Sequence, residues 1–112
     1  MEVQGRDKVT GMPRTISVST SEVVEAIAEP LAAIVNAAKA TLGRTPPELA
    51  ADIIDRGATL TGGGALLRGI DDFMTKALGI SAYRADDPLV CTAIGAGRAL
   101  EDPALLKRLV LA

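Results

Sequence analysis

The chain has 112 residues, 48% of them hydrophobic and 23% charged, with a formal net charge of −2. This profile predicts one small globular domain, and the absence of a basic run argues against a nucleic-acid partner. Without any histidine the chain cannot build a Ser-His-Asp triad, a Cys-His pair or a usual zinc site. A single cysteine, no signal peptide and no apolar stretch of membrane length predict a cytoplasmic protein.

The first part of the chain predicts a β-hairpin followed by a long helix. Residues 3–9 and 15–18 read as extended segments on either side of the turn-forming cluster 10–13. Ser19 precedes Glu22 by three residues, which is the spacing of a capping box, and an apolar series at helical spacing follows. Pro30 interrupts that series, so we expect either a kinked helix or two abutting helices, and we favour the kink.

The second part predicts helices alternating with two strands. Residues 45–57 indicate a short helix that opens on prolines and ends at Gly57, and residues 58–61 and 80–84 read as strands. An amphipathic helix lies between them, so the two strands are expected to pair in parallel. Asp86-Asp87-Pro88 is expected to cap a further helix.

Two features near the end of the chain have open interpretations. The sequence Gly95-Ala96-Gly97 lies inside the last predicted long helix, where glycine weakens a helix by about 1 kcal/mol relative to alanine. We expect these small residues to allow close packing on the sheet, and space for a ligand or neighbouring loop is the alternative. Residues 102–111 indicate one more short helix or a tail whose leucines dock on the body, and an amphipathic membrane anchor is the alternative.

The most informative motif is the glycine corner, Gly62-Gly63-Gly64, between the strand 58–61 and the helix that follows. Glycines let backbone N–H groups approach a ligand, and a helix start presents unpaired donors to negative charge. The corner therefore suits a nucleotide, with a plain strand-to-helix turn as the alternative. It is not a Walker A loop, because Gly69 is followed by Ile70, and Leu67 occupies the third glycine position of a dinucleotide fingerprint.

Several stretches of the chain resemble the bacterial actin family MreB. They are residues 2–7, 45–57, 60–69, 85–93 and 95–101, which are spread over nearly the whole length of the chain. The resemblance implies an α/β fold that forms part of an actin-like ATPase lobe, related to ribonuclease H. The 112 residues are expected to correspond to the C-terminal third of a family member. We expect one portion of the second lobe, with a hairpin region at 1–18 and helices and a parallel strand pair at 19–112.

The same resemblance implies a function in cell shape. Family members bind ATP with magnesium and polymerise into filaments on the inner membrane that guide the cell-wall elongation machinery. The glycine corner matches the family's adenosine-contacting motif, so Gly62, Gly63, Gly64 and Ala65 are the expected cofactor-binding residues. The helix that carries Gly95 and Gly97 resembles the second connecting segment between the lobes.

The parts of the family that are not matched limit what this chain is expected to do alone. The phosphate loops and the magnesium-facing acids lie upstream in family members, so we expect weak or absent ATP binding and no hydrolysis. Family members also pair further strands beside residues 58–61, and an unpaired edge there predicts low stability or association. A non-catalytic module that keeps only a filament- or partner-contacting surface is the alternative function. An independent nucleotide-handling enzyme is disfavoured, because the sequence places no candidate general base near Gly62. The nearest charged residues, Asp55, Arg56 and Arg68, are adequately explained as solvated helix ends.

Overall fold

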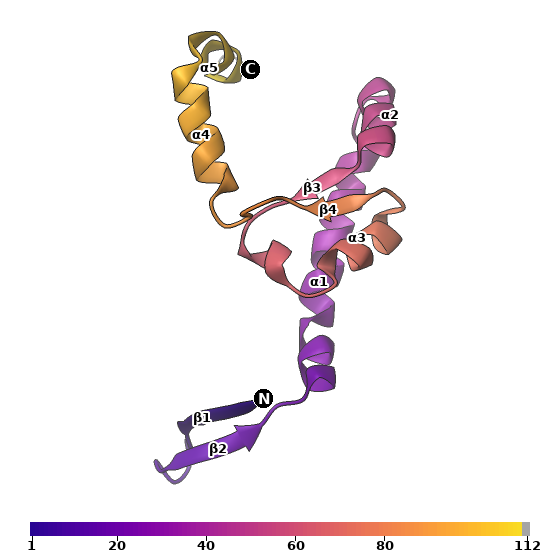
Figure 1. Cartoon of the computed structure of the whole chain (residues 1–112). Coiled ribbons are helices and arrows are strands. Elements are labelled where there is room, and N and C mark those ends of the chain that lie inside the picture. Colours follow the sequence, from indigo (N-terminus) through magenta and orange to yellow (C-terminus); the bar gives the residue numbers. More distant parts are fainter. Residues whose placement is uncertain (111–112) are drawn as a thin grey trace. The chain divides into compact units, whose positions relative to one another are not determined.

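The computed structural model describes residues 1–110 (Figure 1), and the chain divides into two compact units, Met1–Ala37 and Ala38–Ala112. The first unit holds strands β1 (Glu2–Arg6) and β2 (Pro13–Ser17) and the first part of helix α1 (Thr20–Gly43). The remaining elements belong to the second unit. They are α2 (Pro47–Arg56), β3 (Ala58–Leu60), the 3₁₀ helix η1 (Gly63–Leu66), α3 (Ile70–Leu78), β4 (Ala82–Arg84), α4 (Cys91–Glu101) and α5 (Pro103–Val110).

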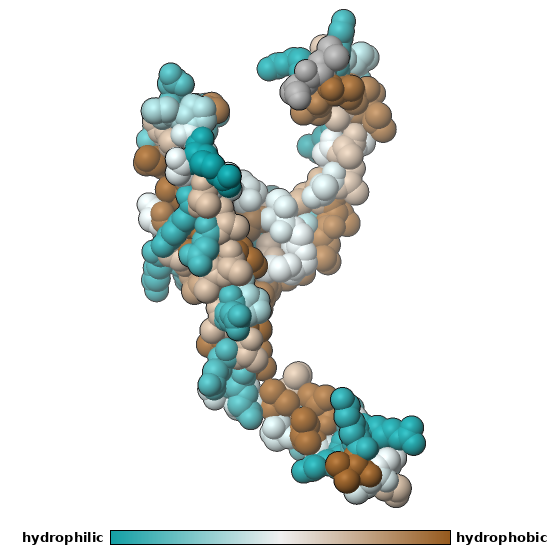
Figure 2. Space-filling model, turned by 180° about the vertical axis from the view of Figure 1, so that it is seen from behind, coloured by the Kyte–Doolittle hydropathy of each residue, from teal (hydrophilic) through white to brown (hydrophobic). Residues whose placement is uncertain are grey.

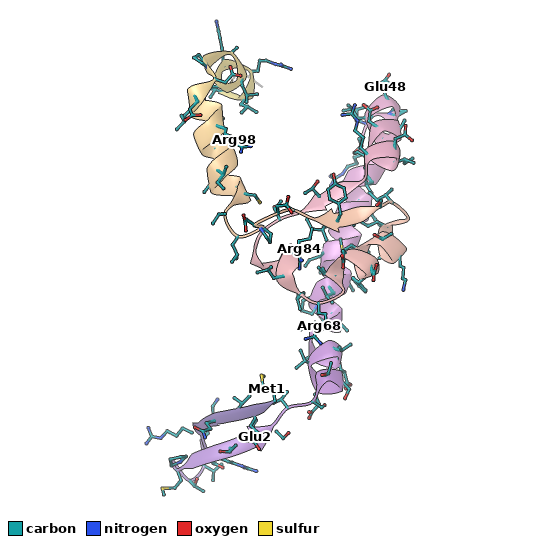
Figure 3. The ribbon with its side chains drawn as sticks, viewed as in Figure 1. Met1, Glu2, Glu48, Arg68, Arg84 and Arg98 are labelled. Carbon is teal, nitrogen blue, oxygen red and sulfur yellow. The ribbon has the colours of Figure 1, made fainter. Side chains whose placement is uncertain are left out.

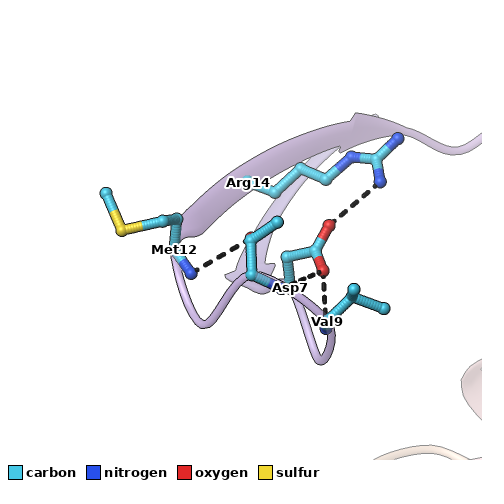
Figure 4. A network of polar contacts seen from close by, with 5 residues as sticks. Asp7, Val9, Met12 and Arg14 are labelled. Atoms are coloured by element: carbon cyan, nitrogen blue, oxygen red, sulfur yellow. Dashed lines mark hydrogen bonds and ion pairs between the residues drawn. The ribbon is translucent and has the colours of Figure 1, made fainter.

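The predicted hairpin is confirmed, with β1 and β2 antiparallel and Val3 opposite Ile16. Its turn is organised by Asp7 (Figure 4). One carboxylate oxygen of Asp7 accepts the backbone N–H groups of Val9 (2.8 Å) and Thr10 (3.1 Å), and the other oxygen pairs with Arg14 at 3.2 Å. The Thr10 and Val9 hydrogen bonds, and then the Arg14 contact, hold the pKa of Asp7 below its ordinary value.

The capping box at the start of α1 is also confirmed. The Glu22 carboxylate accepts the Ser19 backbone N–H at 2.7 Å, and the Ser19 hydroxyl accepts the Glu22 N–H at 3.2 Å. The Ser19 backbone bond, supported by the Ser19 hydroxyl, lowers the pKa of Glu22. Pro30 lies within a single helix rather than between two, although its ring nitrogen has no hydrogen to donate to the preceding turn.

The predicted parallel pairing is found between β3 and β4, with Ala58 opposite Ala82 and Leu60 opposite Arg84. Both strands are shorter than expected, at three residues each. Gly57 ends α2 with a φ of 80°, and a Cβ at this position would lie 2.5 Å from the Ser81 backbone oxygen. Glycine is therefore required where α2 turns into β3.

Two expectations about α4 are wrong. The helix has no side-chain cap from Asp86 or Asp87; instead the backbone carbonyl of Asp87 accepts the N–H groups of Val90 (3.0 Å) and Cys91 (3.2 Å). Gly95 and Gly97 also do not pack closely on the sheet, because no atom of the described residues would lie within 4 Å of a Cβ at either position.

The next helix, α5, has a side-chain cap. The Asp102 carboxylate accepts the N–H groups of Ala104 and Leu105, each at 3.0 Å. Leu106 is half-buried, whereas Leu105 and Leu109 are exposed, so only part of the expected docking is found. Leu111, which the expected tail included, lies outside the described residues.

The core is small for the number of apolar residues. Among the described residues the buried apolar side chains are Val35, Ala65, Met74, Ala82 and Ala99. Many large apolar side chains are exposed, and the face in Figure 2 carries brown, apolar groups at its surface. No helix in the described part of the chain combines the length and apolar character needed to cross a membrane.

Candidate functional site

The glycine corner lies at the carboxyl end of the parallel strand pair. β3 ends at Leu60, and Gly62 then adopts a φ of 83°. The Gly62 N–H donates to the Pro88 carbonyl at 2.8 Å, which ties the corner to the loop that follows β4. Two loops thus meet where both strands end, which is the edge at which open α/β sheets bind ligands.

Two amides of the corner remain available to a ligand. Inside η1 the Ala65 N–H donates to the Gly62 carbonyl and the Leu67 N–H to the Gly64 carbonyl, both at 3.2 Å. The N–H groups of Gly63 and Gly64 begin the turn, and no hydrogen-bond acceptor within residues 1–110 is recorded for either. Both glycines are exposed, so these donors face solvent.

The space around the corner glycines differs from residue to residue. A Cβ at Gly64 would meet no atom within 4 Å, whereas a Cβ at Gly63 would lie 3.4 Å from the Leu89 Cδ2 atom. Ala65 is only 4% exposed, and its amide already serves the turn. The structure therefore places Gly63 and Gly64 at the surface of the corner and Ala65 in the core beneath it.

The expected helix does not start directly at the glycines. Gly69 adopts the left-handed conformation with a φ of 76°, and α3 begins only at Ile70. The Gly69 carbonyl accepts the Phe73 N–H at 3.0 Å, so the first turn of α3 lies after this break. The free donors of the corner consequently belong to the short turn η1, and the dipole of a long helix is not aligned behind them.

An open depression of about 520 Å³ lies beside η1 and the end of β4. Its polar lining includes Tyr83 and Arg84 as well as Asp71, Asp86 and Asp87, and Leu66 and Pro88 supply apolar walls. The sequence interpretation missed Tyr83 and Arg84. The signal was available, because the residue that ends β4 must lie at the same edge as the residue that ends its parallel neighbour β3.

Few charged groups near the corner are paired. Arg84 ends β4, and Arg68 lies in the segment between η1 and α3; both are drawn as sticks in Figure 3. Within residues 1–110 the only ion pair joins Arg14 to Asp7, so neither arginine is neutralised by a carboxylate. The same residues contain no group of three or more side chains arranged to hold a metal ion. What the corner offers chemically is free backbone donors, which suit an anion or a nucleotide, beside a depression lined by one arginine and three carboxylates.

Comparisons with known proteins agree on one family. The family model described as "MreB/Mbl protein" matches residues 1–108. The chain is 55% identical over 102 residues to the cell shape-determining protein Mbl of Bacillus cereus, covering 91% of this chain and 31% of Mbl. It is 48% identical over 101 residues to the cell shape-determining protein MreB of Escherichia coli K12, covering 90% of this chain and 29% of MreB.

Solved structures agree on the fold. The crystal structure of MreB5 of Spiroplasma citri bound to AMPPNP matches with a TM-score of 0.83 at 32% identity, over 98% of this chain and 32% of that one. The structure of the same protein bound to ADP matches equally well. The expected actin-like α/β fold is confirmed, and the chain spans less than a third of the length of these relatives. The chain belongs to the MreB/Mbl family of cell shape-determining proteins.

Proposed function

We propose that this chain is part of an actin-like cytoskeletal protein that binds ATP through the glycine corner and polymerises into filaments. These filaments would lie on the inner membrane and guide the cell-wall elongation machinery, as the family resemblance implies. The observation that carries the proposal is the pair of exposed amides at Gly63 and Gly64, which have no recorded acceptor within residues 1–110. Support comes from a relative of the same fold that was solved with AMPPNP and with ADP.

The corner is proposed to hold the adenosine side of the nucleotide through Gly62, Gly63, Gly64 and Ala65. Gly62 sets the path of the backbone by its positive φ, while Gly63 and Gly64 supply donors. Ala65 anchors the turn from the core. The triphosphate and its magnesium would need further groups, because this corner has no phosphate-gripping lysine. We therefore expect weak binding and no hydrolysis by this chain alone.

The test is a titration of the 112-residue chain with AMPPNP followed by amide chemical shifts in NMR. We expect saturable shifts at Gly62–Ala65 with a Kd of about 1 mM or weaker, because only part of a nucleotide site is present. Gly64→Asp adds a negative charge at an open position and should weaken binding about fivefold. Gly64→Ala is the matched control and should bind as the wild type does, since a Cβ there meets no atom.

A second function is favoured by the exposed apolar surface. Leu89, Ile94 and Leu100 are all exposed along the segment that leads into and forms α4. A non-catalytic module that contacts a filament or a partner through such side chains would not need nucleotide. A chain that is folded by NMR but shows no shift at the corner with AMPPNP would contradict the first proposal and support this one.

A further inference from the structure

The loop between β4 and α4, residues 85–90, fixes the path of the chain into the glycine corner. The Ala85 N–H donates to the Leu60 carbonyl at 3.0 Å, and the Gly62 N–H donates to the Pro88 carbonyl at 2.8 Å. The two solvent-facing amides of the corner follow directly after the second of these hydrogen bonds. Their position therefore depends on the course of this loop.

The carbonyl of Pro88 is the acceptor that joins the loop to both the corner and α4. Besides the Gly62 N–H it accepts the Cys91 thiol, with 3.3 Å between the sulfur and the oxygen. The Pro88 side chain is buried, and its ring restricts rotation about the N–Cα bond. The position of this carbonyl consequently follows the backbone conformation of the preceding residue, Asp87.

Asp87 has an unusual backbone conformation for a residue before proline. Its φ is 45°, and within residues 1–110 it is the one residue other than glycine with a positive φ. Residues before proline normally adopt an extended conformation, and a positive φ is tolerated best by glycine, asparagine and aspartate. The carboxylate of Asp87 neither caps α4 nor forms an ion pair within the described residues. Its backbone carbonyl accepts the N–H groups of Val90 and Cys91, so Asp87 contributes through its backbone.

We infer that Asp87 is a positioning residue of the nucleotide corner, and this inference rests on the proposed function. Its positive φ turns the chain so that the Pro88 carbonyl meets the Gly62 N–H. That hydrogen bond holds the free amides of Gly63 and Gly64 toward a ligand. The Asp87 carboxylate itself makes no contact with the nucleotide. Sparsely populated backbone conformations cluster at ligand-binding sites, where the surrounding structure maintains them.

Hydrogen exchange of the Gly62 amide, measured by NMR without nucleotide, tests the positioning directly. In Asp87→Val a β-branched residue must adopt the positive φ, so the bond to the Pro88 carbonyl should open and Gly62 should exchange about tenfold faster. Asp87→Gly and Asp87→Asn accept this conformation and should keep the wild-type rate. Asp86→Val is the matched control, because it places the same side chain at the neighbouring residue, which has no positive φ. An unchanged rate in Asp87→Val, or an equal increase in Asp86→Val, would overturn the inference.

The Ala82 amide is the internal reference for folding in this experiment. It donates at 2.9 Å to the hydroxyl of Thr75 in α3, which closes the edge of β4 that faces away from β3. Its exchange rate should be the same in all variants. If Asp87→Val also accelerates Ala82, the whole unit is destabilised, and Asp87→Ala, which is less strained, replaces it in the comparison. We then expect Gly62 alone to exchange about threefold faster, and no increase at Gly62 would overturn the inference.

Titration of the same variants with AMPPNP separates this inference from the proposed function. Asp87→Val should bind about fivefold more weakly than the wild type, whereas Asp87→Gly and Asp87→Asn should stay within about twofold of it. A loss in Asp87→Asn as large as that in Asp87→Val would assign the effect to the carboxylate and overturn the inference. Wild-type affinity in an Asp87→Val chain whose Gly62 amide exchanges rapidly would overturn it as well. A wild type that does not bind contradicts the proposed function, whereas an unchanged Gly62 exchange rate in Asp87→Val contradicts the positioning alone.

Discussion

The hairpin β1–β2 and the parallel pair β3–β4 are both two-stranded, but they are stabilised in different ways. The hairpin has no buried residue, and its turn is fixed by polar contacts to Asp7, all within seven residues along the chain. The parallel pair buries Ala82 and depends on contacts from α3 and on the backbone of Gly57. Local hydrogen bonding thus defines the first sheet, and packing between distant segments defines the second.

This difference determines which substitutions each region tolerates. A turn built from exposed hydrogen bonds loses little when one partner is changed, because water replaces it. Where two backbone segments are in contact, as at Gly57 and Ser81, there is no room for a Cβ atom. The glycine corner follows β3, so its residues are held in place by the packing between distant segments that defines the parallel pair, and that packing lies outside the corner itself.

The largest effect on stability is expected from Gly57→Ala, which disrupts the packing of the parallel pair directly. The new Cβ would lie 2.5 Å from the Ser81 oxygen at a residue whose φ is 80°. Strain and overpacking together should lower the free energy of unfolding by roughly 3 kcal/mol. Thermal unfolding followed by circular dichroism measures this loss. Gly64→Ala is the control and should unfold at or slightly above the wild-type temperature, since its Cβ is unobstructed. Equal unfolding temperatures of the two variants would show that Gly57 and Ser81 are not in close contact.

A smaller effect is expected from Thr75→Val, which keeps the shape of the side chain but removes the hydroxyl that closes β4. The Ala82 N–H and carbonyl then lose their partner in a partly buried position. The expected loss is about 1 to 2 kcal/mol, and faster hydrogen exchange of the Ala82 amide should accompany it. Thr75→Ser retains the hydroxyl and should restore slow exchange. If serine and valine exchange equally fast, the hydroxyl does not protect this edge.

The smallest effect is expected in the hairpin, where the charge of Asp7 can be removed by acid or by Asp7→Asn. The pKa of Asp7 is lowered in the folded chain, so its contribution is complete above its ordinary value of 3.8 and is lost as the pH falls through the folded value. Val9 and Thr10 amide shifts recorded by NMR during acidification should therefore report loosening of the turn in the wild type. Asp7→Asn should show no such acid transition, and Glu2→Gln should retain it. An unchanged transition in Asp7→Asn would assign it to another carboxylate.

The elements that sequence predicts well are those marked by short-range chemistry. Ser19 and Glu22 specify the start of α1, and Gly57 marks the end of α2. The failures involve longer-range arrangement. Asp86 and Asp87 have the composition of a cap, but backbone carbonyls perform that role. Gly95 and Gly97 indicate close packing, yet nothing in residues 1–110 lies against them.

The candidate site follows the same division. Gly62, Gly63 and Gly64 can be placed after a strand from sequence alone, and the structure has them directly after β3, while their binding of a cofactor stays a prediction. The interruption at Gly69 was missed, since an amphipathic pattern continues across it and conceals the left-handed turn. Arg84 was missed although the predicted parallel pairing already places the end of the strand 80–84 beside the glycine corner; the exact register, Leu60 opposite Arg84, comes from the folded pair.

That register also has a consequence for the order in which the molecule assembles. The strands of the hairpin are separated only by the turn from Asp7 to Met12, and such contacts form in about 1 to 10 μs. Ala58 can pair with Ala82 only after η1 and α3, which lie between the two strands, have been synthesised. β3 therefore leaves the ribosome before its partner strand exists. During that interval the edge of β3 that later pairs with β4 is unpaired. The nascent chain is therefore most prone to mispairing at β3, in the interval before β4 emerges.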